Sequence, residues 1–150
     1  MDNFWKGKRV LITGANGFLG SHLSIHLLKK GASIIGIIKE NPTVSFLNFA
    51  LKQVRNPKIK IIKSDIVNFI LTARIFKKYK PDICLHIAAQ PIVGIANKFP
   101  LPTFKANIQG TWNILEIARF YMTKAVVVAS SDKAYGEHKK LPYKEDAVLQ

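Results

Sequence analysis

Short apolar runs alternate along the chain with longer segments in which apolar residues recur every three or four positions. The runs are rich in Ile, Val and Leu and cover residues 9–13, 32–38, 59–63, 83–88 and 125–129. Short, predominantly apolar runs of this kind predict strands. The longer segments predict helices over 18–30, 44–54, 68–79 and 103–121. This alternation over 1–150 predicts a single α/β domain with a doubly wound parallel sheet.

Three glycines interrupt the pattern where the first predicted strand passes into the first predicted helix. Gly14, Gly17 and Gly20 have the spacing G-x-x-G-x-x-G, and Gly31 ends the helix. Such a loop lets a phosphate approach the backbone, and the helix that begins near Phe18 offers free N–H groups and the positive end of its dipole. An exposed structural turn is the alternative, but the strand before the loop and the helix after it favour dinucleotide binding in a Rossmann-type sheet.

Acidic residues that follow the second and third runs extend the predicted site. Glu40 stands roughly 20 positions beyond the glycines, where a carboxylate binds ribose hydroxyls. Its charge repels a 2′-phosphate and favours NAD over NADP, although Lys39 beside it opposes this preference. Asp65 is expected to meet the adenine, with Ile66 covering the ring, or to cap the helix that follows. Both roles of Asp65 stay open.

The fourth run passes into small and polar residues. Ala88 and Ala89 leave room for a cofactor against the backbone, and Gln90 follows them. His86 lies inside the apolar run and is expected to be a hydrogen-bonded core histidine. Asn107, near the start of the long helix, is expected to reach the bottom of the site, the alternative being a surface position.

The predicted cofactor-binding residues are Gly14, Asn16, Gly17, Phe18, Leu19, Gly20, Glu40, Asp65, Ile66, Ala88, Ala89, Gln90 and Asn107. The long helix also carries apolar residues at near-helical spacing, which predict a core-packing face: Phe104, Ile108, Trp112, Leu115 and Phe120. The fifth run ends in a group that predicts chemistry, Ser131, Asp132 and Lys133, at the edge where the carboxyl ends of parallel strands meet.

The composition of the chain limits the classes of partner that it can bind. The 23 Lys and Arg against 9 Asp and Glu give a net charge of +14, but the basic residues are scattered. We expect this charge to attract an anionic nucleotide, with nucleic-acid binding as the alternative. The only cysteine, Cys84, is expected to be buried, which excludes a disulfide and a cysteine-based metal site, and no metal is predicted. No apolar run is long enough for a bilayer and the first residues lack a signal peptide's apolar centre, so a cytoplasmic protein is predicted.

Five motifs resemble, in order and spacing, those of the extended short-chain dehydrogenase/reductase family, in particular its NAD-dependent sugar-nucleotide epimerases and dehydratases. They are TGANGFLG at 13–20, DI at 65–66, HIAAQP at 86–91, NIQGT at 107–111 and SSDKAYG at 130–136. Segments 4–10, 41–43, 89–91 and 131–133 are most similar to CDP-glucose 4,6-dehydratases. The resemblance implies NAD as cofactor, a nucleotide-sugar substrate and a homodimer for the full-length relatives.

By this resemblance, the chain is the NAD-binding half of a dehydratase that oxidises C4 of a hexose, eliminates water across C5 and C6, and returns the hydride to C6. Ser131 would bond the C4 oxygen. Asp132 would protonate the departing C6 hydroxyl, which needs a raised pKa, and Lys133 replaces the Glu that many relatives use as the C5 base. A sugar-nucleotide 4-epimerase shares every cofactor residue and is the first alternative. A basic nucleotide- or nucleic-acid-binding module without catalysis is the second.

The family's Tyr, with a Lys four residues later on one helix face, has a single formal match here. Tyr135 and Lys139 have the spacing, but Gly136 and Pro142 oppose the helix that would bring them together. The family's last sheet strands and its sugar-nucleotide domain have no counterpart in the chain. We therefore expect an incomplete Rossmann-type domain that does not turn over alone.

Overall fold

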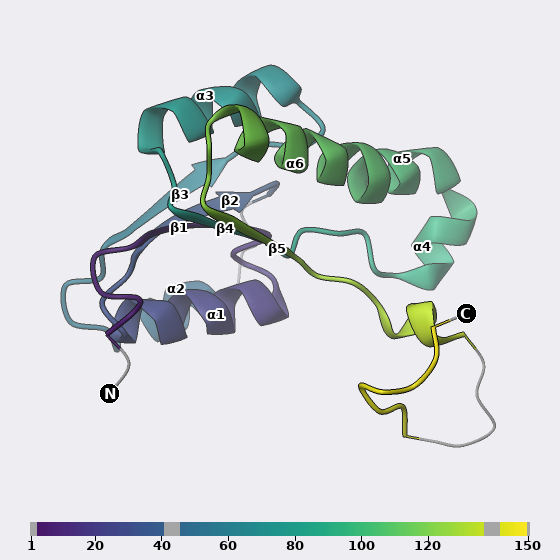
Figure 1. Cartoon of the computed structure of the whole chain (residues 1–150), viewed down its shortest axis with the longest axis horizontal. Coiled ribbons are helices and arrows are strands. Elements are labelled where there is room, and N and C mark those ends of the chain that lie inside the picture. The colour runs from purple at the N-terminus through teal and green to yellow at the C-terminus, as the bar shows by residue number, and fades with distance from the viewer. Residues whose placement is uncertain (1–2, 41–45, 137–141, 150) are drawn as a thin grey trace.

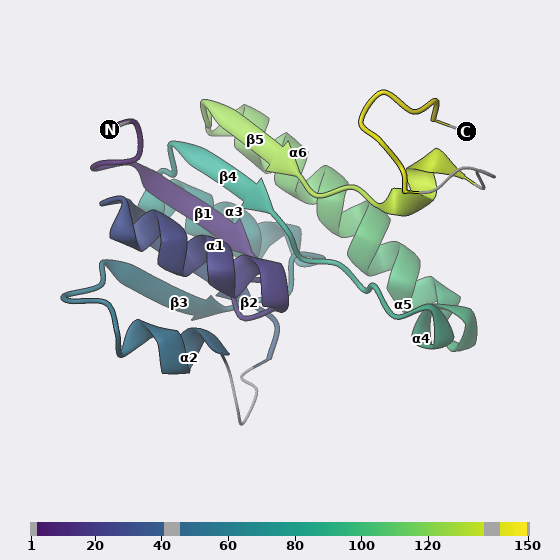
Figure 2. The same ribbon diagram turned by 90° about the horizontal axis from the view of Figure 1, so that it is seen from below.

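Five parallel strands form the sheet of the computed structural model, which describes residues 3–40, 46–136 and 142–149 (Figure 1). They are β1 (Arg9–Thr13), β2 (Ser33–Ile38), β3 (Ile59–Lys63), β4 (Ile83–His86) and β5 (Ala125–Val128). The strand order is β3-β2-β1-β4-β5, and all carboxyl ends meet at one edge (Figure 2). The predicted Rossmann-type, doubly wound parallel sheet is confirmed.

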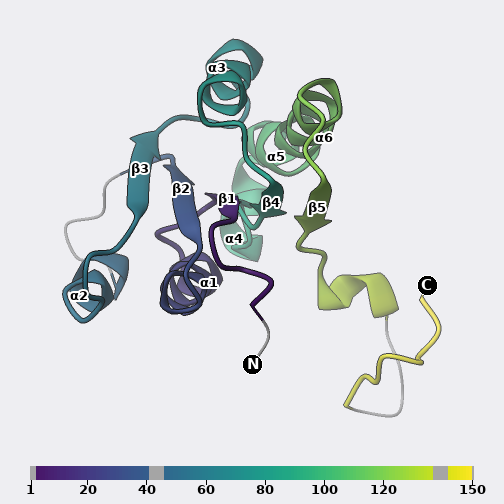
Figure 3. The ribbon, with the colours of Figure 1, turned by 60° about the vertical axis from the view of Figure 1, so that its left-hand side comes forward.

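Helices cover both faces of this sheet (Figure 3). One face carries α1 (Phe18–Lys29) and α2 (Phe46–Leu51), and the other carries α3 (Phe69–Tyr79) and α6 (Gly110–Phe120). The remaining turns of helix are α4 (Val93–Lys98), α5 (Pro100–Phe104), the π-helical turn η1 (Lys105–Gln109) and the 3-10 turn η2 (Asp132–Tyr135). Because α5, η1 and α6 follow one another without a break, the predicted long helix exists but contains a π-helical turn.

Two apolar cores lie on the two faces, and neighbouring residues of each strand alternate between them. In β1, Val10 and Ile12 pack with Leu27 of α1, whereas Leu11 packs on the other face with Phe76 of α3. This alternation follows from the two-residue period of a strand. The three central strands β1, β2 and β4 are therefore buried on both sides, whereas β3 and β5 at the edges of the sheet are partly exposed.

The predicted core face of the long helix is wrong. The five side chains expected inside are between 45% and 68% exposed: Phe104, Ile108, Trp112, Leu115 and Phe120. Ile114, Ile117 and Ala118 occupy the core instead. Apolar residues surround this helix on more than one side, so periodicity alone does not choose which stripe meets the sheet. The π-helical turn also shifts the phase of side chains between α5 and α6.

Some predicted boundaries are too wide. The fourth strand ends at His86 rather than at residue 88, and the second helix covers Phe46–Leu51 rather than 44–54, although 44–45 lie outside the described residues. In the segment before β1, Trp5 packs on the core beside α1, whereas Phe4 is 52% exposed. Only one of these two aromatic residues therefore contributes to the core.

Asp82 fastens the amino-terminal end of the sheet. Its carboxylate accepts hydrogen bonds from the Arg9 backbone N–H at 3.0 Å and from Arg9 Nε at 3.2 Å, and it pairs with Lys124 Nζ at 3.7 Å. Asp82 precedes β4, Arg9 begins β1 and Lys124 precedes β5, so one carboxylate joins three neighbouring strands. The hydrogen bonds from Arg9 lower the pKa of Asp82 to about 2.

Asp82→Asn is expected to lower the free energy of unfolding at pH 7 by about 1 to 2 kcal/mol, because the charge-assisted bonds to Arg9 are weakened. The folded-state pKa lies below the unfolded value of 3.8, so this stabilisation is present above pH 3.8 and is lost as the pH falls toward about 2. Urea unfolding of both proteins across this range measures the effect. Glu116→Gln, which removes an exposed pair with Arg119, is the control. Equal losses in the two variants would contradict the special role of Asp82.

Candidate functional site

The glycine loop packs tightly against the segment that follows β4. Gly14 has φ +68, and a Cβ there would lie 3.0 Å from the Cα and N atoms of Ala88. A Cβ on Gly20 would overlap the carbonyl oxygen of Gly14. The loop is also fixed to β2, because the Gly14 N–H donates to the Ile37 carbonyl at 2.8 Å. A side chain at Gly14 or Gly20 would therefore collide with the backbone, so this loop conformation requires glycine at both positions.

The amino-terminal end of α1 opens at this loop without a side-chain cap. Gly17 is the N-cap residue and its position offers no side-chain acceptor, and the first turn contains no acidic residue. The first N–H groups of a helix have no partner within the helix, and together with the helix dipole they attract an anion. Phe18 is 86% exposed and Leu19 is 49% exposed. The first turn of α1 is thus accessible to a ligand.

The end of β2 is joined to the glycine loop and to the end of β3. Asn16 Nδ2 donates to the Glu40 carbonyl oxygen at 2.8 Å, while the Glu40 residue is exposed. Lys39 Nζ lies 3.2 Å from Asp65 Oδ2. The lysine beside Glu40 is therefore paired with a carboxylate, a contact that no sequence pattern indicated.

Asp65 and Ile66 sit where β3 ends. Asp65 Oδ1 accepts the Val67 N–H at 3.0 Å, but Asn68 is the residue that caps α3, with its side chain accepting the Leu71 N–H at 3.0 Å. The alternative in which Asp65 caps the helix is therefore wrong. The Ile66 side chain is 7% exposed and packs in the core beneath α6.

The segment after β4 is held from the long helix. Asn107 lies in η1, where its Oδ1 accepts the Gln90 N–H at 2.7 Å and its Nδ2 donates to the Gln90 carbonyl at 3.1 Å. Ala88 is partly buried against the glycine loop, and Ala89 is exposed. Asn107 thus contacts the predicted site through the backbone of Gln90, which excludes a purely surface position.

A buried histidine links this segment to β1. His86 is 2% exposed, with Nδ1 2.7 Å from Thr13 Oγ1 and Nε2 3.0 Å from Thr111 Oγ1. Burial lowers its pKa from 6.5, so the neutral ring is favoured. The predicted hydrogen-bonded core histidine is confirmed. Thr13 and Thr111 stand in motifs of the sequence, but the partners of a hydroxyl depend on tertiary packing that the motifs do not contain.

The three residues predicted to carry chemistry follow β5 and are exposed. Ser131 Oγ donates to Asp132 Oδ1 at 3.2 Å and accepts the Lys133 N–H at 3.2 Å, and Lys133 Nζ lies 3.5 Å from Asp132 Oδ2. The hydrogen bond from Ser131, followed by the charge of Lys133, lowers the pKa of Asp132. The raised pKa expected of Asp132 is therefore wrong for this arrangement, because the carboxylate is solvated and paired rather than buried.

Tyr135 ends the 3-10 turn η2 instead of beginning an α-helix. Its ring stacks on that of Tyr143, with centroids 5.2 Å apart and an interplanar angle of 15°. Gly136 follows with φ +65, which breaks the helical path. Lys139, the other member of the formal pair, lies outside the described residues.

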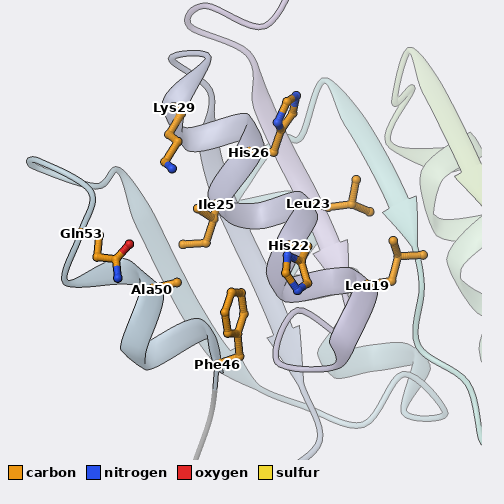
Figure 4. Close-up of a pocket in the computed structure, with 9 residues that line it drawn as sticks. All are labelled: Leu19, His22, Leu23, Ile25, His26, Lys29, Phe46, Ala50 and Gln53. Atoms are coloured by element: carbon orange, nitrogen blue, oxygen red, sulfur yellow. The ribbon is translucent and has the colours of Figure 1, made fainter.

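A hollow of about 580 Å³ lies elsewhere, between α1 and α2 (Figure 4). His22 and Phe46 stack across it with ring centroids 4.4 Å apart, and Leu19, Leu23 and Ala50 add apolar lining. The hollow sits on the outer flank of two helices and shares only Leu19 with the predicted site.

Other chemistry has little support in the described part of the chain. Within 3–40, 46–136 and 142–149, no three His, Cys, Asp or Glu side chains gather as a metal ion requires. None of the helices described has the length and apolar character needed to cross a membrane. Cys84 is buried, and burial raises the pKa of its thiol to about 12.

A parallel sheet of this order with a glycine loop at its carboxyl edge defines a Rossmann-type nucleotide-binding domain. Residues 11–150 match the sequence pattern of the family described as GDP-mannose 4,6 dehydratase. The chain belongs to this family of NAD-dependent sugar-nucleotide dehydratases and epimerases.

Relatives within the family differ in activity. The chain is 39% identical over 134 residues to the CDP-glucose 4,6-dehydratase of Salmonella typhimurium, a match that covers 89% of this chain and 37% of the relative. It is 33% identical to UDP-glucuronate 4-epimerase 1 of Arabidopsis thaliana, covering 93% and 33%. The structure of UDP-glucose 4-epimerase from Bifidobacterium longum with NAD+ and UDP matches with a TM-score of 0.84 and 27% identity, covering 95% and 42%. The chain thus spans less than half the length of these relatives.

Ser131→Ala is expected to raise the pKa of Asp132 back toward its ordinary value of 3.8, because the hydroxyl that bonds the carboxylate is removed. Lys133→Gln should raise it by a smaller amount. Carboxyl-carbon NMR titration of the Asp132 side chain measures both changes, and Ser130→Ala is the matched control. An Asp132 pKa that stays low in Ser131→Ala would contradict the hydrogen bond.

Proposed function

We propose that this chain is the NAD-binding half of a sugar-nucleotide 4,6-dehydratase acting on CDP-glucose or a similar nucleotide-hexose. The observation that carries the proposal is the glycine loop, in which an uncapped helix end with no acidic residue in its first turn lies at the carboxyl edge of the sheet. Such an end binds the pyrophosphate of a dinucleotide. The Bifidobacterium longum relative, crystallised with NAD+, supports the choice of cofactor.

The residues present fit NAD at three points. The N–H groups of the first turn of α1 would bind the pyrophosphate, and the exposed carboxylate of Glu40 would bind the adenosine ribose. Ala88 and Ala89 would leave room for the cofactor beside the glycine loop. When bound, NAD supplies the hydride acceptor for oxidation at C4 of the sugar.

The group after β5 would act on the substrate. Ser131 would donate a hydrogen bond to the C4 oxygen, Asp132 would protonate the departing C6 hydroxyl, and Lys133 would take the proton from C5. With Asp132 exposed and its pKa lowered, the carboxylate is not set to donate a proton at neutral pH. We therefore propose that the 150-residue chain binds NAD without turning over alone.

A sugar-nucleotide 4-epimerase is the second candidate. It is favoured by the epimerases among the relatives, at 33% identity for the Arabidopsis thaliana enzyme. The 39% identity to a CDP-glucose 4,6-dehydratase favours dehydration, as does the acidic residue directly after Ser131. An acid at this position serves the loss of the C6 hydroxyl, a step that epimerisation lacks.

Gly17→Ala is expected to weaken NAD binding roughly tenfold or more while the chain stays folded. A Cβ on Gly17 meets only the Gly14 carbonyl oxygen, at 3.3 Å, so the added methyl group mainly obstructs a phosphate on the loop. Calorimetric titration with NAD measures the affinity. Gly94→Ala is the matched control, since a Cβ there has no neighbour within 4 Å.

Equal NAD affinity in Gly17→Ala and the wild type would contradict the placement of the pyrophosphate. Repeating the titration at two salt concentrations separates this proposal from nucleic-acid binding by the +14 charge. Binding to a polyanionic backbone falls steeply with salt, whereas NAD binding should change modestly.

Preference for NAD over NADP is expected to depend on Asp65. The Asp65 carboxylate pairs with Lys39 at 3.2 Å and keeps that ammonium from favouring a 2′-phosphate near Glu40. In Asp65→Asn, the ratio of NADP to NAD affinity should rise roughly two- to fivefold, the size of an exposed ion pair. A loss of adenine contact would weaken both cofactors equally and leave the ratio unchanged. Adding Lys39→Gln to Asp65→Asn should remove the gain, and a gain that persists would contradict this role of Lys39.

A further inference from the structure

A directed chain of hydrogen bonds runs through the molecule beneath the glycine loop. At one end, Thr13 Oγ1 accepts the N–H groups of Ile87 and Ala88, each at 3.1 Å. A hydroxyl oxygen has two lone pairs, so both are occupied and its single hydrogen remains. That hydrogen must be donated to His86 Nδ1, 2.7 Å away. Nδ1 is therefore the acceptor nitrogen of the ring.

The hydrogen bonds at the other end of this series independently require the same protonation of the His86 ring. Thr111 Oγ1 donates its hydrogen to the backbone carbonyl of Asn107, one turn earlier in the helix, at 2.7 Å. It has no second hydrogen and must accept from His86 Nε2 at 3.0 Å. The two threonines thus require one tautomer, the neutral ring with its proton on Nε2.

This series of hydrogen bonds connects the residues that hold the segment from Ala88 to Gln90 in place. Thr13 holds the N–H of Ala88, whose backbone meets Gly14, and Asn107 holds both backbone groups of Gln90. Asn107 lies in the π-helical turn η1, and π-helical turns are frequent at functional sites. His86 spans the gap between the two threonines. The segment is thereby fixed at its first and last residues.

We propose that His86, as the neutral Nε2–H tautomer bridging Thr13 and Thr111, is a positioning residue that holds the segment 88–90 in the conformation that binds NAD. This inference rests on the proposed NAD site. His86 acts through the two threonines and through Asn107, and it does not itself touch the cofactor. Its protonation state consequently controls the fraction of molecules that are competent to bind.

Protonation of His86 breaks the series of hydrogen bonds at Thr13. Nδ1–H would need an acceptor, but both lone pairs of Thr13 Oγ1 are occupied, and the Thr13 hydrogen would lose its own acceptor. The side chains that strand register and hydrogen bonding place beside His86 carry no charge that would offset the positive charge of the ring. Val128 lies opposite on β5, Thr111 comes from α6, and Cys84 on the same face of β4 is a neutral thiol.

The sign of the pH dependence follows from the same geometry. The pKa of His86 is lower in the folded chain than the ordinary 6.5, so the folded state releases the proton more readily than the unfolded one. Stability is therefore complete above pH 6.5 and falls as the pH drops through the folded-state value. NAD affinity should fall in the same window, because a disordered segment lowers the competent fraction.

The tautomer is tested first, by nitrogen-15 NMR of the histidine rings in the 150-residue chain at pH 7.5. The expected spectrum has an unprotonated Nδ1 and a protonated Nε2 for His86, assigned by its loss in His86→Asn. A protonated Nδ1, or a charged ring, would overturn the inference whatever the chain does with NAD.

The positioning role is tested with two pairs of variants that differ in a hydroxyl. Thr13→Val and Thr111→Val remove the bridge, whereas Thr13→Ser and Thr111→Ser retain it. Calorimetric titration with NAD at pH 7.5 should show roughly tenfold weaker binding for the valine variants and near-normal binding for the serine variants. Circular dichroism reports whether each variant is folded. The exposed His26 of α1 provides the control His26→Gln, which should bind as the wild type does.

The pH profile separates a positioning role from a merely structural one. Wild-type NAD affinity should fall below pH 6.5, and in His86→Asn the affinity should be weaker but independent of pH in this window. Equal profiles in wild type and His86→Asn, with NAD binding intact, would overturn the inference and leave the proposed function standing. Failure of the folded wild type to bind NAD at any pH would overturn the proposed function, and the inference with it.

Discussion

The close approach between the glycine loop and the backbone after β4 is the constraint on which the candidate site depends. Gly14 lies so near Ala88 that no side chain fits between them, and the same Ala88 N–H is held by Thr13. Two segments far apart in sequence are thus joined at the carboxyl edge of the sheet. The uncapped end of α1 and the backbone of residues 88–90 consequently share one surface.

The candidate site has two electrostatically different parts. The charges in one suit cofactor binding, and those in the other do not suit proton donation. The first turn of α1 contains no acidic residue, and Glu40 and the Lys39–Asp65 pair stand at the neighbouring strand ends. This part fits a dinucleotide. In the part after β5, Asp132 is exposed and its pKa is lowered by Ser131, which suits a carboxylate rather than a proton donor. Cofactor binding and catalysis therefore make separate demands on the chain.

Much of the fold can be predicted from the sequence because predominantly apolar strands alternate with helices and the glycines have a specific spacing. The periodicity of the long helix was less informative. Trp112 and Ile114 are both apolar and only two positions apart, yet one is exposed and the other is buried. Periodicity detects apolar faces, but the packing of α6 on β4 and α3 decides which of them is covered.

The candidate site could likewise be predicted only in part from the sequence. Positions of the glycines, Glu40 and the alanines after β4 follow from the motif and from the rule that ligands bind at the carboxyl ends of parallel strands. The bridge from Thr13 through His86 to Thr111 does not, because hydroxyl and imidazole groups have several partners available until tertiary packing selects them. The lowered pKa of Asp132 likewise depends on neighbours whose orientation the sequence does not contain.

NAD is expected to bind at the carboxyl edge and not in the hollow between α1 and α2. Amide NMR spectra of the 150-residue chain recorded during titration with NAD test this directly. Binding at the carboxyl edge should shift the signals of Gly17, Phe18 and the segment 88–90, with little change at Ala50 and Gln53 of the hollow. Shifts confined to the hollow, or an unchanged spectrum from a folded chain, would contradict it.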